Sequence, residues 1–111
     1  MKVIYVAGPY RGKSEWEVTQ NIRRAEQTAI ECWKKGWSVI CPHKNTAHFG
    51  GILPDYVWLE GDFEMIRRSD AICMIDGWQE SVGAKHELEE AQESGLEIYY
   101  GEESVPDLGV K

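Results

Sequence analysis

The sequence has little positive charge and no long apolar run. Lys and Arg number 12 against 19 Asp and Glu among 111 residues, which gives a formal net charge of −7. Binding to a nucleic-acid polymer or to an anionic membrane needs clustered positive charge, so this balance disfavours both kinds of partner. No stretch has the length of a membrane-spanning helix, and the N-terminus lacks a signal-peptide pattern. We therefore expect a cytoplasmic protein.

Cysteine is also sparse. Cys32, Cys41 and Cys73 fall within predicted helices or strands, so we expect no disulfide framework. Cys41 could ligate zinc together with His43 and His48, but these residues lack the second ligand pair typical of a structural zinc site. We expect neither a bound metal nor another cofactor.

What the chain does contain is a regular alternation of two patterns. Short β-branched runs predict strands at residues 2–7, 37–41, 71–75 and 96–100. Helical segments lie between them. The first begins at the capping-box pattern of Ser14 and Glu17 and ends at Gly36; the others follow Pro54 and the loop of residues 76–83, the last ending at Gly95.

Apolar residues at helical spacing predict the buried faces of these helices. They are Val18, Ile22, Ala25, Ala29 and Trp33 in the first helix, Tyr56, Leu59, Phe63 and Ile66 in the second, and Ala84, Leu88 and Ala91 in the third. Trp78 instead lies in a glycine-flanked loop, where a large ring suits stacking on a ligand or a subunit contact. The many aromatic residues and the short sheet edge favour a homo-oligomer.

The alternation predicts an α/β fold, a three-layer sandwich around a flavodoxin-like parallel sheet of four or five strands in the order 2-1-3-4. We expect one domain at residues 1–100 and a tail at 101–111, either a loose end or an arm that orders against another subunit. In this strand order the ligand crevice is expected between residues 8–13 and 76–83. The long polar loop at residues 42–51 should overhang it.

The loop after the first strand resembles a phosphate-binding loop. Three residues separate Gly8 from Gly12, whereas the Walker A pattern has four, and Pro9 removes one amide donor. A P-loop nucleoside triphosphatase is therefore the weaker interpretation. Amides and Arg11 ahead of a helix N-terminus still suit a phosphate.

Two carboxylates lie beside the predicted buried faces. Asp62 adjoins the apolar stripe of the second helix, and Glu87 lies at the edge of that of the third. Glu87 is either a partly exposed acid favoured by the helix dipole or an acid turned toward the sheet. Glycosyl chemistry needs one acid as nucleophile and another as proton donor. The helix N-terminus should keep Glu87 ionised, and the hydroxyl of Tyr5 could orient it.

Three short motifs carry a resemblance to a known family. Residues 5–12, Asp62 and residues 81–91 are together similar to the nucleoside 2-deoxyribosyltransferase superfamily. The similarity is nearest to its 2'-deoxynucleoside 5'-monophosphate N-glycosidases and extends to an uncharacterised branch of short proteins. The resemblance implies that Glu87 attacks C1' of the sugar and forms a covalent intermediate, that Tyr5 hydrogen-bonds this glutamate, and that Asp62 handles the sugar or the leaving base.

The resemblance also implies that Arg11 and Ser81 hold a 5'-phosphate, so the expected partner is a small nucleoside or nucleotide. The candidate binding residues are Gly8, Pro9, Arg11, Gly12, His43, Asn45, Trp78, Ser81 and Gly83. Pro9 replaces a small hydroxyl residue of the monophosphate enzymes, and Lys85 and His86 replace small or apolar ones. These departures favour, as the alternative, a non-catalytic nucleotide-binding or sensing module.

Overall fold

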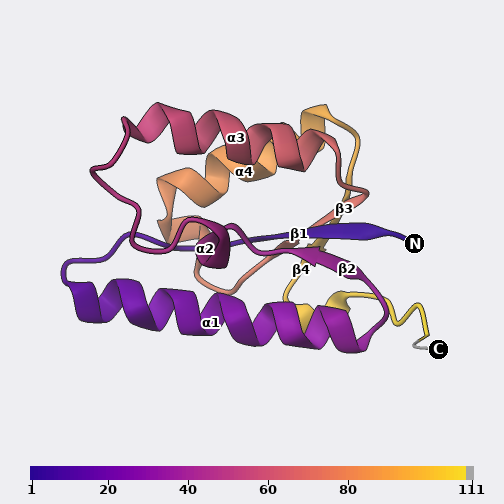
Figure 1. Cartoon of the computed structure of the whole chain (residues 1–111). Helices are drawn as coiled ribbons and strands as arrows, with labels where there is room; N and C mark the ends of the chain where they lie inside the picture. Colours follow the sequence, from indigo (N-terminus) through magenta and orange to yellow (C-terminus); the bar gives the residue numbers. More distant parts are fainter. Residues whose placement is uncertain (110–111) are drawn as a thin grey trace.

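The computed structural model describes residues 1–109. Its sheet consists of β1 (Val3–Ala7), β2 (Ser38–Ile40), β3 (Ala71–Met74) and β4 (Glu97–Tyr100). All neighbouring strands pair in parallel, in the order β2-β1-β3-β4 (Figure 1). The predicted strand order 2-1-3-4 is confirmed, and the sheet has four strands.

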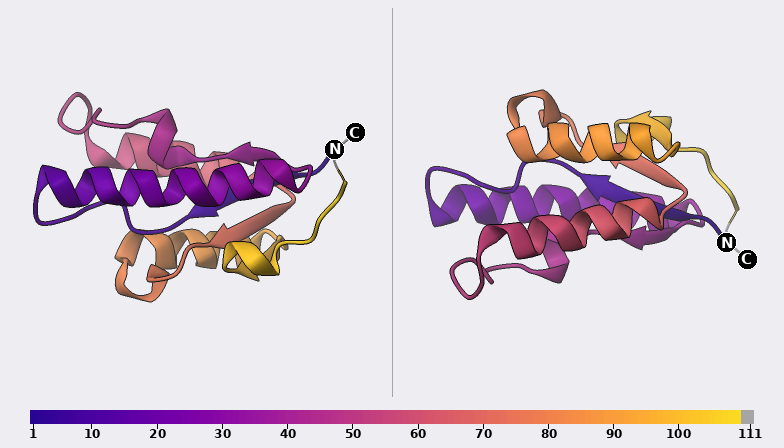
Figure 2. Two further views of the ribbon diagram at one scale, coloured as in Figure 1. Left: turned by 90° about the horizontal axis from the view of Figure 1, so that it is seen from below. Right: turned by 90° about the horizontal axis from the view of Figure 1, so that it is seen from above.

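Helices cover both faces of this sheet. The long helix α1 (Glu15–Lys34) lies on one face, and α3 (Asp55–Arg67) and α4 (Val82–Glu93) lie side by side on the other (Figures 1 and 2). Three short helices complete the chain: α2 (Pro42–Asn45), η1 (Trp78–Glu80) and η2 (Glu102–Ser104). The predicted three-layer α/β sandwich is confirmed. In residues 1–109, no helix is long and apolar enough to cross a membrane.

Local caps set the helix boundaries. Ser14 Oγ accepts from the Glu17 amide at 3.2 Å, as in a capping box. The Glu17 carboxylate accepts in return from the amide of Lys13 at 2.9 Å, one residue before the Ser14 amide that it would usually bond. Ser81 Oγ accepts from the Ala84 amide at 3.1 Å and caps α4. Gly36 follows α1 with φ +91°, a left-handed conformation that favours glycine.

The alternating side chains of the strands divide the core. Tyr5, Ala7, Ile72 and Met74 point to the face under α3 and α4, where Leu88 packs on them. The intervening strand residues point to the α1 side, where Ile22, Ala25, Ala29 and Cys32 are buried. The third predicted helical face, Ala84, Leu88 and Ala91, is buried throughout.

Three predicted core residues lie at the surface. Trp33 is 52% exposed because the buried stripe of α1 steps from Ala29 to Cys32 instead. In α3, Tyr56 is 62% and Leu59 44% exposed. A 13-residue helix is about 20 Å long, whereas a four-residue strand spans only about 13 Å. The first turns of α3 therefore extend past the sheet that buries its last turns.

The C-terminal segment packs on its own chain. Lys35 Nζ donates to the carbonyls of Glu102 and Val105 at 2.6 and 2.9 Å, and Trp37 Nε1 donates to Pro106 O at 2.8 Å. Val105 is buried beside Trp37. Residues 102–106 therefore pack on the domain and are not a loose end, whereas contact of this segment with another subunit stays a prediction. The last two residues of the expected tail, 110 and 111, lie outside the described residues.

Candidate active site

The centre of the site is a contact between β1 and α4. Tyr5 is fully buried in the middle of β1, with its side chain on the α3/α4 face. Its hydroxyl donates to Glu87 Oε2 on α4, which joins residues that are 82 positions apart in the sequence. Glu87 is half-buried, so its carboxyl turns toward the sheet and is not a solvated acid at the helix start.

The protonation of Glu87 differs from the sequence-based expectation. Burial raises its pKa to about 8; the hydrogen bond from Tyr5 opposes this shift, and the charge of Asp62 adds to it. The free energy of removing this carboxylate from water outweighs the favourable helix N-terminus. Near neutral pH the free protein therefore holds Glu87 mainly as the neutral acid, whereas the helix dipole alone predicted an ionised one.

Asp62 supplies the second acid of the site from α3. It is half-buried, and burial raises its pKa to about 6. Its charge raises the pKa of both Tyr5 and Glu87, so the three groups lie within electrostatic reach of one another. Burial and these two acids raise the Tyr5 pKa well above its usual value, which keeps the hydroxyl protonated as a donor. The fold thus brings together all three residues proposed as catalytic.

The loop after β1 is held by close packing. A Cβ on Gly8 would lie 2.8 Å from Ile75, and one on Gly12 would lie 2.4 Å from the Glu17 Cβ. Asn21 of α1 donates to the carbonyls of Tyr10 and Arg11 at 3.1 and 3.3 Å. These contacts account for both glycines without a phosphate.

Arg11 itself reaches across the loop to α3. Its guanidinium forms an exposed ion pair with Asp55, the first residue of that helix. The predicted phosphate-binding cation therefore has an internal anion as its partner. The ion pair bridges the loop after β1 and the end of α3 that extends past the sheet.

His43 of α2 is hydrogen-bonded to the loop after β1. It lies in α2 with only 4% of its surface exposed, and its Nε2–H donates to the Pro9 carbonyl at 2.8 Å. Burial lowers its pKa, which favours the neutral ring. Asn45, at the end of the same short helix, is exposed. The loop predicted at residues 42–51 thus begins with a helical turn whose histidine holds Pro9 in place.

The short helix η1 and the start of α4 form the other border of the expected ligand site. The ring of Trp78 lies against Tyr100, with the centroids 5.7 Å apart, and packs on the α3/α4 core. The hydroxyl of Ser81 caps α4. Gly83 is exposed, and a Cβ there would meet only Ser81 Oγ, at 4.0 Å. Trp78 therefore packs against Tyr100 of its own chain, and its predicted contact with a ligand or a subunit stays a prediction.

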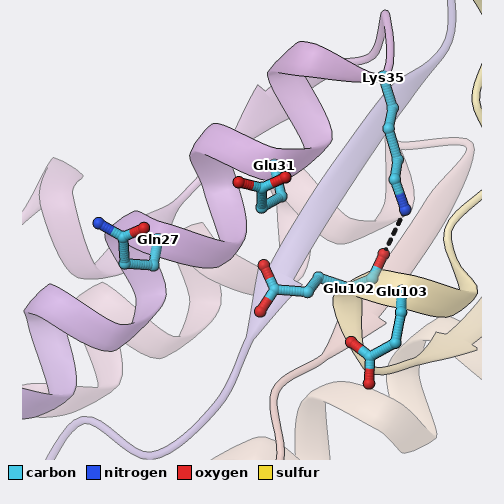
Figure 3. A pocket seen from close by; sticks show the side chains of 5 residues that line it. All are labelled: Gln27, Glu31, Lys35, Glu102 and Glu103. Atoms are coloured by element: carbon cyan, nitrogen blue, oxygen red, sulfur yellow. Dashed lines mark hydrogen bonds between the residues drawn. The ribbon is translucent and has the colours of Figure 1, made fainter.

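Two cavities lie on the opposite, α1 side of the sheet. One of about 80 Å³ is lined by Pro9, Asn21, Arg24, Ile75 and Asp76, where β1 and β3 end. The other, of about 460 Å³, lies between α1 and η2 (Figure 3) and is lined by Gln27, Glu31, Lys35, Glu102 and Glu103. Its three carboxylates make the larger cavity unsuited to a phosphate. Neither cavity contains the acids on α3 and α4.

Trp58 lies beside the candidate acids, and the sequence interpretation did not name it. It lies one helical turn before Asp62 and is half-buried, while residues 55–57 and 59–61 around it are exposed. The ring of Phe49 packs against it, with the centroids 5.9 Å apart. The spacing of four residues between Trp58 and Asp62 was the available signal.

The fold places the protein in a structural class. A solved structure of a 2-deoxyribosyltransferase from the psychrotolerant bacterium Bacillus psychrosaccharolyticus matches it with a TM-score of 0.63 at 23% sequence identity. The match covers 88% of this chain and 70% of that one. The predicted resemblance to deoxyribosyltransferases is confirmed at the level of the fold.

A comparison of the sequence with models of protein families identifies the family of this chain. The chain belongs to the family described as a domain of unknown function, DUF4406, whose model matches residues 2–100. A search of curated proteins gave no match. Among residues 1–109, no three His, Cys, Asp or Glu side chains gather as a metal site would require.

Proposed function

We propose that this protein cleaves the N-glycosidic bond of a (deoxy)nucleoside or its 5'-monophosphate, as an N-glycosidase or deoxyribosyltransferase. The observation that carries the proposal is the partly buried hydrogen bond from Tyr5 to Glu87, with a second perturbed acid, Asp62, within electrostatic reach. Pairs of acids with separated pKa values are typical of glycosyl chemistry. The shared fold with a 2-deoxyribosyltransferase supports the same reaction class.

In the proposed first step, a carboxylate oxygen of Glu87 attacks C1' and forms a glutamyl ester to the sugar. The C1'–N bond breaks, its electron pair leaves with the base, and the Asp62 carboxylic acid supplies a proton to that base. In the second step a water, or the nitrogen of another base, attacks C1' and releases Glu87. Asp62 accepts the proton that this nucleophile loses. Tyr5 stays protonated and directs the attacking oxygen.

The two acids together hold the one proton that these two reaction steps require, but the proton favours the other acid. Attack needs Glu87 ionised and Asp62 protonated, whereas the pKa values of about 8 and 6 favour the reverse arrangement. Both arrangements contain one proton, so the active one is populated over the same pH range. The active arrangement is the minor one in the free protein, because the pKa of Glu87 is the higher of the two. A bound sugar that develops positive charge at C1' stabilises the ionised Glu87 and favours the active form.

The substrate-binding end is proposed at the crevice mouth. Arg11 and the capped N-terminus of α4 at Ser81 offer a cation and backbone amides for a 5'-phosphate. The Gly8, Pro9, Gly12 and Gly83 backbones, together with His43, Asn45 and Trp78, form or support the surrounding loops. Arg11 exchanges its Asp55 partner for the phosphate.

We also propose a homo-oligomer. Large apolar side chains are exposed at the start of α3 and just before it, namely Phe49, Ile52, Leu53 and Tyr56. Exposed apolar groups gathered on one segment are typical of interaction surfaces. Sedimentation or light scattering of the parent and of Tyr56→Asp measures this directly.

The test of the reaction is base release from deoxynucleosides and their 5'-monophosphates. Glu87→Gln should reduce the rate on the order of 10³-fold or more, because the amide is a far weaker nucleophile. Glu89→Gln, an exposed neighbour on the same helix, should leave the rate unchanged. Equal rates for Glu87→Gln and the parent, or no release from any of these substrates, would contradict the proposal.

A second candidate is a non-catalytic nucleotide-binding or sensing module. The proton on Glu87 at neutral pH favours it, because a neutral acid is a hydrogen-bonding group and not a nucleophile. This candidate predicts thermal stabilisation by a nucleotide without turnover. It also predicts that Glu87→Gln binds the nucleotide as well as the parent does.

A further inference from the structure

A buried indole N–H on α3 has no acceptor. Among the described residues, only two buried side-chain nitrogen or oxygen atoms lack a hydrogen-bond partner, Trp58 Nε1 and His43 Nδ1. His43 already bonds Pro9 through its other ring nitrogen, so the ring is anchored. Trp58 has no second polar atom, and its single donor is therefore unused.

An unused buried donor carries a free-energy cost. Leaving such a group without a partner typically costs about 1–3 kcal/mol, and native proteins contain few of them. Such groups are often explained by a ligand or an ordered water that completes the hydrogen bond. The position of Trp58 in the fold therefore decides which ligand its indole N–H could donate to.

Trp58 lies at the border of the proposed site. It precedes Asp62 by four residues, so the two side chains leave the same face of α3, about 6 Å apart along the helix axis. α3 leads into β3 within a parallel sheet, so its N-terminal end lies toward the carboxyl edge of the strands. Trp58 is thus nearer the crevice mouth than Asp62, and Phe49 of the overhanging loop packs on it.

We propose that Trp58 recognises the base of the substrate, its indole N–H donating to a carbonyl oxygen or ring nitrogen of the heterocycle. This inference rests on the proposed function and extends it to a specificity residue. The rings of Trp58 and Phe49 border the flat face of the base, since aromatic side chains suit stacking on heterocycles. Asp62, one helical turn further along α3, is then placed between the base and the sugar of the substrate.

The first experiment reads the indole N–H itself. ¹⁵N-labelled Glu87→Gln protein, which keeps a substrate intact, is titrated with dAMP, dGMP, dCMP, dTMP and 2-deoxyribose 5-phosphate. The five tryptophans give separate indole signals, and the one absent from a Trp58→Phe spectrum belongs to Trp58. At least one nucleotide should shift this signal. Deoxyribose 5-phosphate, which has the sugar and phosphate but no base, should bind without shifting it.

The second experiment measures affinity by calorimetry on the same background. Trp58→Phe keeps an aromatic ring and removes the donor. It should weaken the nucleotide about 5- to 10-fold and leave deoxyribose 5-phosphate unchanged. Trp33→Phe, an exposed tryptophan on the other face of the sheet, is the matched control and should change neither affinity.

The remaining outcomes separate the two proposals. If a nucleotide binds while the Trp58 signal stays in place, or if Trp58→Phe weakens both ligands equally, base recognition by Trp58 is wrong and the proposed function stands. If none of the nucleotides and none of the corresponding deoxynucleosides binds or loses its base, the proposed function fails and this inference fails with it.

Discussion

The two acids of the site share one chemical type and differ in their surroundings. Glu87 sits against buried Tyr5, and Asp62 lies on the flank of α3, so burial raises the pKa of Glu87 to about 8 and that of Asp62 to about 6. The hydroxyl of Tyr5 stays a donor throughout this range. Residue-scale predictions therefore concern protons, because the two acids lose theirs on either side of neutrality.

The first prediction is a bell-shaped pH dependence of kcat/KM for base release, with limbs near pH 6 and 8. Activity needs one proton shared by the two acids, so it is lost below the lower pKa and above the higher one. Asp62→Asn should lower the rate and remove the alkaline limb. Its acid limb should reflect Glu87 alone, below pH 8, because the charge of Asp62 no longer raises the Glu87 pKa. A parent profile that is flat from pH 5 to 9 would exclude both roles.

The second prediction concerns stability. Folding raises the Glu87 pKa from about 4.5 to about 8, so the folded state binds more protons than the unfolded state between these values. The free energy of unfolding of the parent should therefore fall as pH rises across this window. Glu87→Gln, an isostere of the neutral acid, should remove most of that fall. Its Tm should equal that of the parent near pH 4, below the unfolded pKa, and exceed it near pH 9, and identical pH slopes would contradict the assignment.

At the scale of elements, α3 borders the proposed substrate site. The sheet buries its last turns at Ile66, while its first turns extend past the short strands and are exposed. The extended part has Asp55 at its tip and Trp58 on its inner side. Through Asp55 it is linked to Arg11 on the loop after β1. The same extension thus exposes apolar side chains and brings a competing anion to the predicted phosphate-binding cation.

The third prediction follows from this ion pair. Asp55→Asn should strengthen binding of a deoxynucleoside 5'-monophosphate up to about fivefold, because exposed ion pairs contribute at most about 1 kcal/mol. Binding of the unphosphorylated nucleoside should not change. Glu15→Gln, which removes an exposed acid from the first turn of α1, is the control. Calorimetry of both ligands checks the result, and equal gains for nucleoside and nucleotide would show that Arg11 does not read the phosphate.

At the scale of the whole molecule, the two faces of the sheet differ in the residues that lie on them. The α3/α4 face holds the proposed catalytic residues above a packed core. The α1 face is closed by the C-terminal segment, and its larger cavity is lined mainly by acids (Figure 3). With a net charge of −7, the protein repels anions except where a cation is placed. Under the proposed function, Arg11 is the cation that would attract the phosphate of the substrate.

The fourth prediction tests the closure of the α1 face. Val105→Ala should lower the free energy of unfolding by about 1–3 kcal/mol, since it opens a cavity beside Trp37 in the core. Leu108→Ala, at a half-exposed position in the same segment, should cost less than about 0.5 kcal/mol. Denaturant unfolding measures both. Equal, negligible effects would mean that the segment does not contribute to the core.

The sequence by itself determined the architecture, because strand runs, caps and stop glycines are local signals. The Ser14 cap and the buried face of α4 follow from residue type and spacing within one element, and the strand order follows from the alternation of strands and helices along the chain. The resemblance to the nucleoside 2-deoxyribosyltransferase superfamily also implied that Tyr5, Asp62 and Glu87 belong to one site.

Only the tertiary structure decided the burial, the protonation and the hydrogen-bond partners of those groups. The proton on Glu87, the pairing of Arg11 with Asp55 and the unused donor of Trp58 all depend on contacts between distant segments. Likewise, the exposure of Tyr56 depends on strands that are too short to cover α3. Helical periodicity identifies which side of an element is apolar. Burial, and with it pKa and hydrogen bonding, is set by what the rest of the chain places against that side.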